Sequence, residues 1–309
     1  MKVSIVIVSY NVSTFLNECL YSIKKETNCT YEIIVVDNNS EDESVEIVKR
    51  NHPGVHIIES QENLGFAKAN NVGFRKAKGD YVFMLNPDTV ILDSAIDRLV
   101  HFMDENPEIG ACGPKNLNPD LTLQYNCHHF PTLSMSLIEC LQLKRFFPKN
   151  KFFGREHMTY WNYNEVKEVD WITGCSLLFR KKLLDQIGDL DENYFMYSEE
   201  CDFCYRLKQQ IWKTVFNPRA SLVHYGGQSS MVQNIQDVYS RTIFRYMFDS
   251  KYYFFRKHYG KTREFFLRLL YAVYFSFSLF KNLIMITKKN RRERIDSAKV
   301  VIFSALNKS

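Results

Sequence analysis

The stretch VSIVIVSY, residues 3–10, is dominated by the β-branched residues Val and Ile. Such a run is typical of a strand that is buried on both faces in a parallel sheet. Three similar runs follow, separated by helical patterns: strands are predicted at 31–40, 55–60 and 80–88, and helices at about 41–50 and 66–77. Strands that alternate with helices predict an α/β fold with a doubly wound, mostly parallel sheet.

Polar residues stand at the ends of several predicted strands. Asn11, Asp37 and Asp88 each follow or close such a run. Ligands of doubly wound sheets bind beyond the carboxyl ends of the strands, so we expect the functional site there. Another strand followed by a helix is predicted over 169–188, whereas 110–170 has no regular pattern and predicts a loop-rich connection.

Charge is unevenly distributed along the 309 residues. Residues 1–240 carry 24 Lys and Arg against 31 Asp and Glu, whereas residues 241–309 carry 16 against 4. From about residue 231 the composition also becomes aromatic and basic, with helical periodicity. We therefore predict a catalytic domain over 1–230 and a helical extension over 231–309. An acidic body suggests cation chemistry, and a basic extension suggests an anionic surface as partner.

The eight cysteines contain one close pair, Cys201 and Cys204. A single Cys-x-x-Cys is weak evidence for zinc, because a structural zinc site needs a second pair of ligands, and none follows in the sequence. The first residues, MKVSIVIVSYN, do not resemble a secretory signal. These observations predict a reduced, cytoplasmic setting.

Two groups of polar residues allow two explanations each. Asp37, followed by Asn38, could bind a pyrimidine base and a ribose; a strand-to-helix turn capped by Ser40 or Asn39 explains the same residues, and alone it is the stronger explanation. Asp88 could hold Mg²⁺ or Mn²⁺ against a diphosphate, since hard oxygen ligands suit these ions. Equally, Asp88 could cap the helix that begins around residue 92.

The segment YSEECDFCYR, residues 197–206, gathers three carboxylates in ten positions. In a helix Asp202 and Arg206 would pair at i, i+4. The apolar stripe of that helix would consist of Phe203, Cys204, Leu207 and Ile211.

That register leaves Glu200 at the start of the helix, where it can face a cleft and act as a general base. His224, in LVHYGGQSS, can serve as a neutral metal ligand. A lone histidine is more often structural, so it counts only in combination with the other groups.

Taken together, six segments resemble glycosyltransferase family 2. In chain order they are VSIVIVSYN, IIVVDNNS, NLGFAKANNVGF, YVFMLNPDT, VDWITGCSLLFRKKLLDQIGDLDENYFMYSEECDFCYRL and VHYGGQSS. They cover most of residues 3–230. The resemblance implies the GT-A fold, a Rossmann-like sheet flanked by helices, here with a C-terminal helical extension. The pattern is nearest to the bacterial rhamnosyltransferase branch, whose members commonly carry the Asn-Pro-Asp form of the metal motif.

The resemblance also implies roles for single residues. Glu200 corresponds to the catalytic base, and Asp88 and His224 to ligands of Mg²⁺ or Mn²⁺. The implied donor and acceptor residues are Tyr10, Asn11, Asp37 and Asn38 in the nucleotide pocket, Asn63, Gly65 and Asn70 near the diphosphate or sugar, Asn86 beside the ribose, Trp171 and Gly174 at the sugar and acceptor site, and Glu199 as the alternative base.

Three positions depart from the family pattern. Position 200 is Glu where Asp is usual, Cys175 replaces a common Ala, and Asp189 replaces a common Gly. The glutamate places the base on a side chain one methylene longer, which could slow the enzyme or rearrange the backbone slightly.

The extension contains an aromatic and apolar run between Arg268 and Lys281, followed by five basic residues within 288–294. The uninterrupted run is 12 residues long, short of the about 20 that span a bilayer. We therefore favour an interfacial helix on an anionic membrane. The alternative is a helical hairpin packed on the catalytic body or on a second subunit, which leaves a homodimer open.

The resemblance implies metal-dependent, inverting transfer of a sugar, L-rhamnose from dTDP-rhamnose, to a glycan or lipid-linked glycan in cell-surface polysaccharide biosynthesis. The protein would be peripheral on the inner face of the cell membrane, without a nucleic-acid partner. A nucleotidyltransferase would need a glycine-rich phosphate loop after the first strand, and VSYNVSTFLNE offers none. There are two alternatives. One is a transferase for UDP- or GDP-linked sugars; the other is an inactive scaffold subunit, which is consistent with Glu200 at a position where the family usually has Asp.

Overall fold

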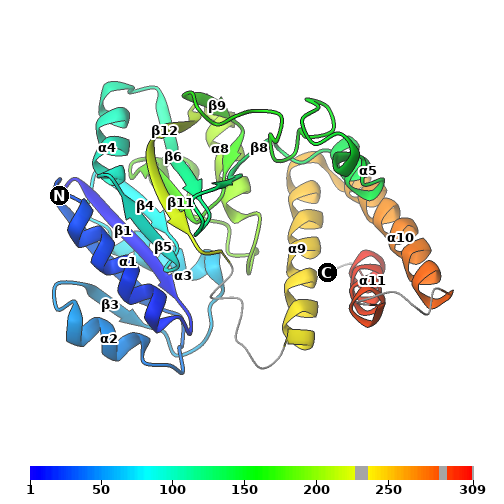
Figure 1. Cartoon of the computed structure of the whole chain (residues 1–309), viewed down its shortest axis with the longest axis horizontal. Coiled ribbons are helices and arrows are strands. Elements are labelled where there is room, and N and C mark those ends of the chain that lie inside the picture. The colour runs from blue at the N-terminus through cyan, green and yellow to red at the C-terminus, as the bar shows by residue number, and fades with distance from the viewer. Residues whose placement is uncertain (227–235, 285–290, 308–309) are drawn as a thin grey trace.

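The computed structural model describes residues 1–226, 236–284 and 291–307 (Figure 1). A large twisted sheet with helices on both faces forms one part of the molecule, and three C-terminal helices stand beside it. The predicted α/β fold with a mostly parallel central sheet and a C-terminal helical extension is confirmed. The predicted domain boundary between residues 230 and 231 lies outside the described residues.

The path of the sheet combines the predicted strands with later ones. Its strand order is β3 (His56–Glu59), β2 (Tyr31–Asp37), β1 (Val3–Ser9), β4 (Tyr81–Leu85), β11 (Ser176–Arg180), β6 (Ile109–Leu117), β12 (Lys213–His224) and β5 (Thr89–Leu92). The first four strands run parallel, as do β6 and β12, whereas β11 is antiparallel to both of its neighbours. The short strands β7 (Leu123–Gln124) and β9 (Lys167–Val169) pair with β6 and β12.

The prediction of a loop-rich connection over 110–170 is wrong for its first part. β6 lies inside the sheet, between β11 and β12. Its sequence IGACGPKNL contains glycine and proline, which are depleted in strands, so the local pattern does not predict it. The rest of the region holds α5 (Leu133–Cys140), α6 (Leu143–Phe146) and a small ladder of β8 (Cys127–His128) with β10 (Trp171–Ile172).

β1 supplies side chains to two separate hydrophobic cores, because successive residues of a strand point to opposite faces. Ile5 and Ile7 pack in the core under α1 (Ser13–Glu26), α2 (Ser44–Asn51) and α4 (Ala95–Glu105). Val6 and Val8 pack in the other core, under α3 (Phe66–Lys76) and α8 (Glu199–Gln209). Full burial of such side chains stabilises the fold by about 1.5–3 kcal/mol each.

The extension consists of α9 (Gln236–Tyr259), α10 (Lys261–Ile284) and α11 (Arg291–Leu306). Tyr252, Phe254 and Phe255 of α9 are fully buried and belong to the same core as Val6 of β1. The extension therefore packs on the catalytic body, as the hairpin alternative predicted. Residues 288–290 of the predicted basic segment lie outside the described residues. By length and composition α10 could cross a membrane, and 22% of its most apolar stretch is buried.

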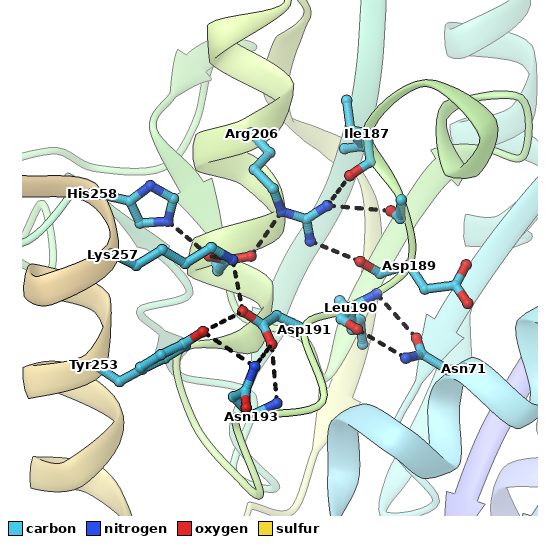
Figure 2. Close-up of polar contacts among 12 residues, drawn as sticks. Asn71, Ile187, Asp189, Leu190, Asp191, Asn193, Arg206, Tyr253, Lys257 and His258 are labelled. Atoms are coloured by element: carbon cyan, nitrogen blue, oxygen red, sulfur yellow. Dashed lines mark hydrogen bonds and ion pairs between the residues drawn. The ribbon is translucent and has the colours of Figure 1, made fainter. Parts of the chain in front are cut away.

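Ion pairs join α9 to α8 (Figure 2). The carboxylate of Asp202 is fully buried and accepts hydrogen bonds from Arg206 Nε at 2.8 Å and His258 Nε2 at 2.7 Å. Lys257 Nζ lies 2.6 Å from Asp202 Oδ1 and also donates to Asp191 at 2.7 Å. Asp191 precedes α8 and accepts the hydroxyl of Tyr253, so three residues from one turn and a half of α9 fasten it to α8 and the preceding loop.

We predict that Asp202→Asn destabilises the protein by about 3 kcal/mol at pH 7, because it removes the buried negative charge that Arg206 and Lys257 share. Burial alone would raise the pKa of Asp202, but His258, Arg206 and Lys257 lower it from 3.8 to about 2. A lowered carboxyl pKa stabilises the fold above pH 4, and this contribution disappears as the pH falls toward 2. Urea unfolding should therefore show a smaller difference between the two proteins at pH 3 than at pH 7. Asp185→Asn, at an exposed position on the short helix α7 (Leu183–Ile187), is the control, and an equal loss there would contradict the assignment.

Candidate active site

A cavity of about 580 Å³ lies where β1, β2 and β4 end. Most of the residues that the sequence singled out line it: Tyr10, Asn38, Asn63, Gly65, Asn86, Asp88, Gly174, Glu199, Glu200 and His224. They come from segments as far apart as β1 and β12, and the parallel strands bring them to one edge of the sheet, as predicted for a doubly wound fold.

Asp37 closes β2 and is buried to 3% exposure. One carboxylate oxygen, Oδ2, accepts the backbone N–H of Ser40 at 3.0 Å, which fixes the turn after the strand. The other oxygen, Oδ1, is buried and has no hydrogen-bond partner. A buried acceptor without a partner costs free energy, so Oδ1 is suited to receive an N–H from a ligand.

A second loop is held against β2 by amide side chains. Asn38 accepts the backbone N–H of Leu64 at 2.8 Å and donates to Asn63 Oδ1 at 2.9 Å. Gly65 follows with φ of +77°, and a Cβ at this position would lie 2.5 Å from the carbonyl oxygen of Phe195. Only glycine combines this backbone angle with so close an approach, so the glycine fixes how tightly the loop packs on the segment before α8.

Asp88 and His224 are brought together by the β5–β12 ladder, in which His224 pairs with Thr89. Asp88 Oδ1 lies 3.4 Å from His224 Nε2. The other imidazole nitrogen, Nδ1, lies 2.7 Å from Oε1 of Gln124, which orients the ring. A carboxylate and an oriented imidazole nitrogen thus converge on the cavity, as in sites where a second partner fixes a histidine ligand.

Cys175 lies beside this pair, buried, and its sulfur accepts a hydrogen bond from Asn116 Nδ2 at 3.0 Å. Burial alone would lower the pKa of His224, but Cys175 and Asp88 raise it to about 10. The anionic surroundings of His224 therefore favour its protonated form, and Nε2 would have to lose its proton before it could hold a metal ion. Within the part of the chain that the structure describes, no group of three or more His, Cys, Asp or Glu is arranged to hold a metal ion.

Glu199 and Glu200 form the first turn of α8, after Tyr197 and Ser198 in the left-handed conformation with φ of 70° each. Such backbone angles are strained for residues other than glycine and recur at functional sites. Glu200 Oε1 accepts the backbone N–H of Gly174 at 3.2 Å. Its other oxygen, Oε2, is buried and has no hydrogen-bond partner, so it can accept a proton from a ligand.

Both glutamates have raised pKa values. Burial is the main cause for each, and for Glu199 the charge of Glu200 adds to it. The N–H of Gly174 partly opposes the shift at Glu200. Two neighbouring buried carboxyls resist being ionised together, so the pair is suited to hold or receive a proton.

Four predicted residues are described but do not line the cavity. Asn11 accepts the N–H of Glu41 and so shapes the turn after β2, and Asn70 donates to the carbonyl of Phe66 within α3. Trp171 stacks on His128 with ring centroids 4.1 Å apart. Asp37, the fourth, lies directly beside the lining residue Asn38.

The prediction for the helix core was partly wrong. Phe203, Cys204 and Leu207 are buried, but Ile211 is 91% exposed. α8 ends at Gln209, and Ile211 has φ of 64°, so the chain has already turned out of the helical register. Cys201 and Cys204 are both buried, which suits packing.

Sequence reasoning missed several lining residues: Gln124, Tyr125, Phe195, Met196, Tyr197, Thr242, Ile243 and Tyr246. The last three belong to α9, and the ring of Tyr246 stacks on Phe195 with centroids 4.6 Å apart. Phe195, Met196 and Tyr197 directly precede the two predicted glutamates, so their position in the sequence could have marked them as lining residues. No local signal distinguishes the α9 residues, because only packing brings that helix to the cavity.

Comparisons with known proteins agree on one family. The family model described as Glycosyl transferase family 2 matches residues 4–188. The N-acetylglucosaminyl-diphospho-decaprenol L-rhamnosyltransferase of Mycobacterium tuberculosis is 27% identical over 237 residues, which are 73% of this chain and 76% of that protein. Glu200 and His224 lie beyond the segment that the family model matches.

Two solved structures resemble the fold. The mannosyltransferase PcManGT from Pyrobaculum calidifontis, in complex with GDP-Man and Mn²⁺, superposes with a TM-score of 0.58 at 15% identity, over 99% of this chain and 86% of that one. GalNAc-T7 with UDP, GalNAc and Mn²⁺ gives a TM-score of 0.55 at 17% identity, over 80% of this chain and 51% of that one. At these identities the likeness bears on the fold alone, and the predicted GT-A fold is confirmed.

We predict that Glu199→Gln stabilises the protein, and more so as the pH rises. The raised pKa of Glu199 means that wild-type stability falls as the pH rises through that pKa, because the ionised carboxylate is buried beside Glu200. Glutamine cannot ionise, so the melting temperature should rise by about 2–4 °C at pH 8 and by less at pH 5. Glu18→Gln, on the exposed face of α1, is the matched control. A gain that does not depend on pH would contradict this account.

Proposed function

The chain belongs to glycosyl transferase family 2, and from this premise we propose that it is an inverting, metal-dependent enzyme that transfers L-rhamnose from dTDP-rhamnose to a glycan or lipid-linked glycan. The observation that carries the proposal is one cavity that holds a cation-favouring pair, Asp88 and His224, together with an unpartnered glutamate oxygen on Glu200. The rhamnosyl assignment is supported by the mycobacterial relative.

The charge of the cavity supports the need for a cation. Its lining contains Asp88, Glu199 and Glu200 but no Lys or Arg among the residues that the structure describes. A nucleotide diphosphate beside Asp88 is repelled unless positive charge offsets the repulsion, and within the described lining only His224, whose pKa is raised, can carry such charge. A bound metal ion would supply the remainder. Mg²⁺ and Mn²⁺ need only one or two protein ligands when phosphate oxygens and water complete their shell, and Asp88 and His224 fit that requirement. When bound, the ion would stabilise the charge that develops on the leaving diphosphate.

Glu200 is proposed as the general base. Its raised pKa makes it a stronger proton acceptor than an exposed glutamate. In the transfer, Glu200 Oε2 takes the proton of the acceptor hydroxyl while the hydroxyl oxygen bonds to the anomeric carbon and the bond to the diphosphate breaks. The hydrogen bond from Gly174 N–H to Oε1 keeps the longer glutamate side chain directed at the cavity.

Asp37 is proposed to select the nucleotide. The buried, unpartnered Oδ1 can accept the ring N–H that thymine and uracil carry between their two carbonyl groups. Tyr10 lines the adjoining wall and can pack against a base. This arrangement supports a pyrimidine nucleotide, in line with a dTDP-linked donor.

We propose that the extension brings the enzyme to the inner face of the cell membrane. Its basic C-terminal segment would bind the anionic surface of that membrane. Residues 241–309 carry 16 Lys and Arg against 4 Asp and Glu. Each basic residue near an anionic membrane contributes about 1 kcal/mol of attraction. A lipid-linked acceptor, such as the one named for the mycobacterial relative, would require the enzyme at that surface.

Replacement of the proposed base provides the first test. We expect Glu200→Gln to lower the transfer rate roughly 10²- to 10⁴-fold, with nucleotide binding retained, and Glu200→Asp to keep measurable activity. Wild-type activity should fall as the pH drops through the raised pKa of Glu200, because the protonated form cannot accept a proton. Release of sugar and nucleotide from a panel of nucleotide sugars, with and without acceptor, measures this. A wild-type protein without metal-dependent turnover of any donor would overturn the proposal.

Removal of the metal pair provides the second test. We expect Mn²⁺ to tighten dTDP binding to the wild type by roughly 10- to 100-fold, and this gain to vanish in Asp88→Ala and His224→Ala. Calorimetric titration of dTDP with Mn²⁺ and with EDTA measures the difference. The control is Asp185→Ala, which removes an exposed carboxylate that does not line the cavity. This variant should keep the full Mn²⁺-dependent gain in dTDP affinity. A gain that persists in both cavity variants would place the cation elsewhere.

A further inference from the structure

Residues 141–155, LQLKRFFPKNKFFGR, combine exposed aromatic and basic side chains. Phe146 is 71% exposed and Phe152 is 57% exposed, although both are large apolar residues. The same fifteen residues contain five Lys and Arg and no acidic residue. Exposed phenylalanines among lysines and arginines are typical of segments that lie in the interface of an anionic membrane. We call residues 141–155, which include the short helix α6, the aromatic-basic loop.

The aromatic-basic loop lies beside α10, although the two are more than 100 residues apart in the sequence. Figure 1 shows α5, which leads into the loop, packed along α10 at the end of the molecule farthest from β3. Gln142 donates to the hydroxyl of Tyr274 at 3.3 Å, and Glu139 accepts the hydroxyl of Tyr271 at 2.9 Å. Lys251 of α9 bonds both Glu139 and Tyr271, so a polar cluster in which Tyr271 is buried and Glu139 is half exposed fixes the α5–α10 contact.

The outward face of α10 is apolar. Leu269, Val273, Phe277 and Phe280 are exposed and follow one another at spacings of three and four residues, which places them on one stripe of the helix. The opposite stripe, with Leu267 and Tyr271, is buried against the rest of the protein. A large exposed apolar stripe on a packed helix indicates a surface that contacts another protein or a membrane.

We propose that the aromatic-basic loop and the outward stripe of α10 form one composite surface that docks on an anionic lipid bilayer. The phenylalanines and the stripe would enter the boundary between headgroups and acyl chains, while the lysine and arginine stems reach the lipid phosphates. This part of the proposal rests on the membrane partner proposed above for the extension, and it adds a second contact, outside the extension.

Charge selects the bilayer over a second copy of the chain as the occupant. Arg145, Lys149, Lys151 and Arg155 are exposed in the loop, and the extension that carries α10 is itself strongly basic. Two copies that met through this face would bring like charges together, whereas anionic headgroups would neutralise them.

Sedimentation with vesicles of phosphatidylcholine containing 30% phosphatidylglycerol tests the surface, with the full chain and vesicles of pure phosphatidylcholine for comparison. We expect Phe146→Ser with Phe152→Ser to weaken binding at least fivefold, and Lys149→Glu with Lys151→Glu at least tenfold. Phe277→Ser with Phe280→Ser should weaken it to a similar extent as the loop phenylalanines. Hydrolysis of the donor in solution should not change in any of these variants, because none lies at the cavity.

Matched controls use exposed residues on other faces. Tyr21→Ser with Ile211→Ser removes comparable exposed apolar area, and Lys24→Glu with Lys25→Glu reverses the same charge. Both should bind vesicles as the wild type does. Point variants are preferable to truncation after α9, because α10 covers Phe248 and Tyr252 of α9 and its removal would expose that core.

Different failures have different meanings. If the α10 variant loses binding and the loop variants do not, the composite surface is wrong while the membrane role of the extension stands. If the wild type binds no vesicles, neither the loop nor the α10 stripe docks on lipid. The same conclusion follows if the wild type dimerises in solution and these variants are monomeric. Neither result affects the proposed transfer reaction, which donor turnover tests separately.

Discussion

Burial of β1 on both faces is the constraint on which the rest of this structure depends. Because Ile5 and Val6 point to opposite cores, helices must cover both sides of the sheet. Polar side chains on these strands are then accommodated at the strand ends, where the backbone leaves the core. Asp37 and Asp88 occupy such ends, and the cavity lies between them and the first turn of α8.

The cavity is built around unfavourable charge. Two buried glutamates with raised pKa values stand at the start of α8, and a third carboxylate, Asp88, lies beside His224 without a lysine or arginine in the described lining. Such an arrangement costs stability in the empty protein, and the cation and acceptor hydroxyl that we propose as ligands would offset that cost. The strained backbone at Tyr197 and Ser198 fits the same pattern, since strain persists where the surrounding structure holds it for a function.

The C-terminal helices belong to the enzyme's core as well as to its surface. α9 contributes Tyr246 to the cavity. Its Lys257 and His258, labelled in Figure 2, contact the buried carboxylate of Asp202 on α8, the helix that carries Glu200. Movement of α9 would therefore alter both a wall of the cavity and the position of Glu200, the proposed base. Beyond α9, α10 and the aromatic-basic loop turn apolar side chains outward, which connects the proposed membrane contact to the same helical unit.

The sequence by itself determined the alternating strands and helices, the edge of the sheet that bears the site, and the candidates at that edge, because hydrophobic periodicity and the position of Asp37, Glu200 and Asp88 are local properties. It could not place β6, whose glycines and proline become a central strand only between β11 and β12. Only the tertiary structure decided that His224 meets Asp88, that Trp171 stacks on His128 outside the cavity, and that α9 closes one wall. Those contacts depend on strand register and helix packing between distant segments, for which no local pattern carries information.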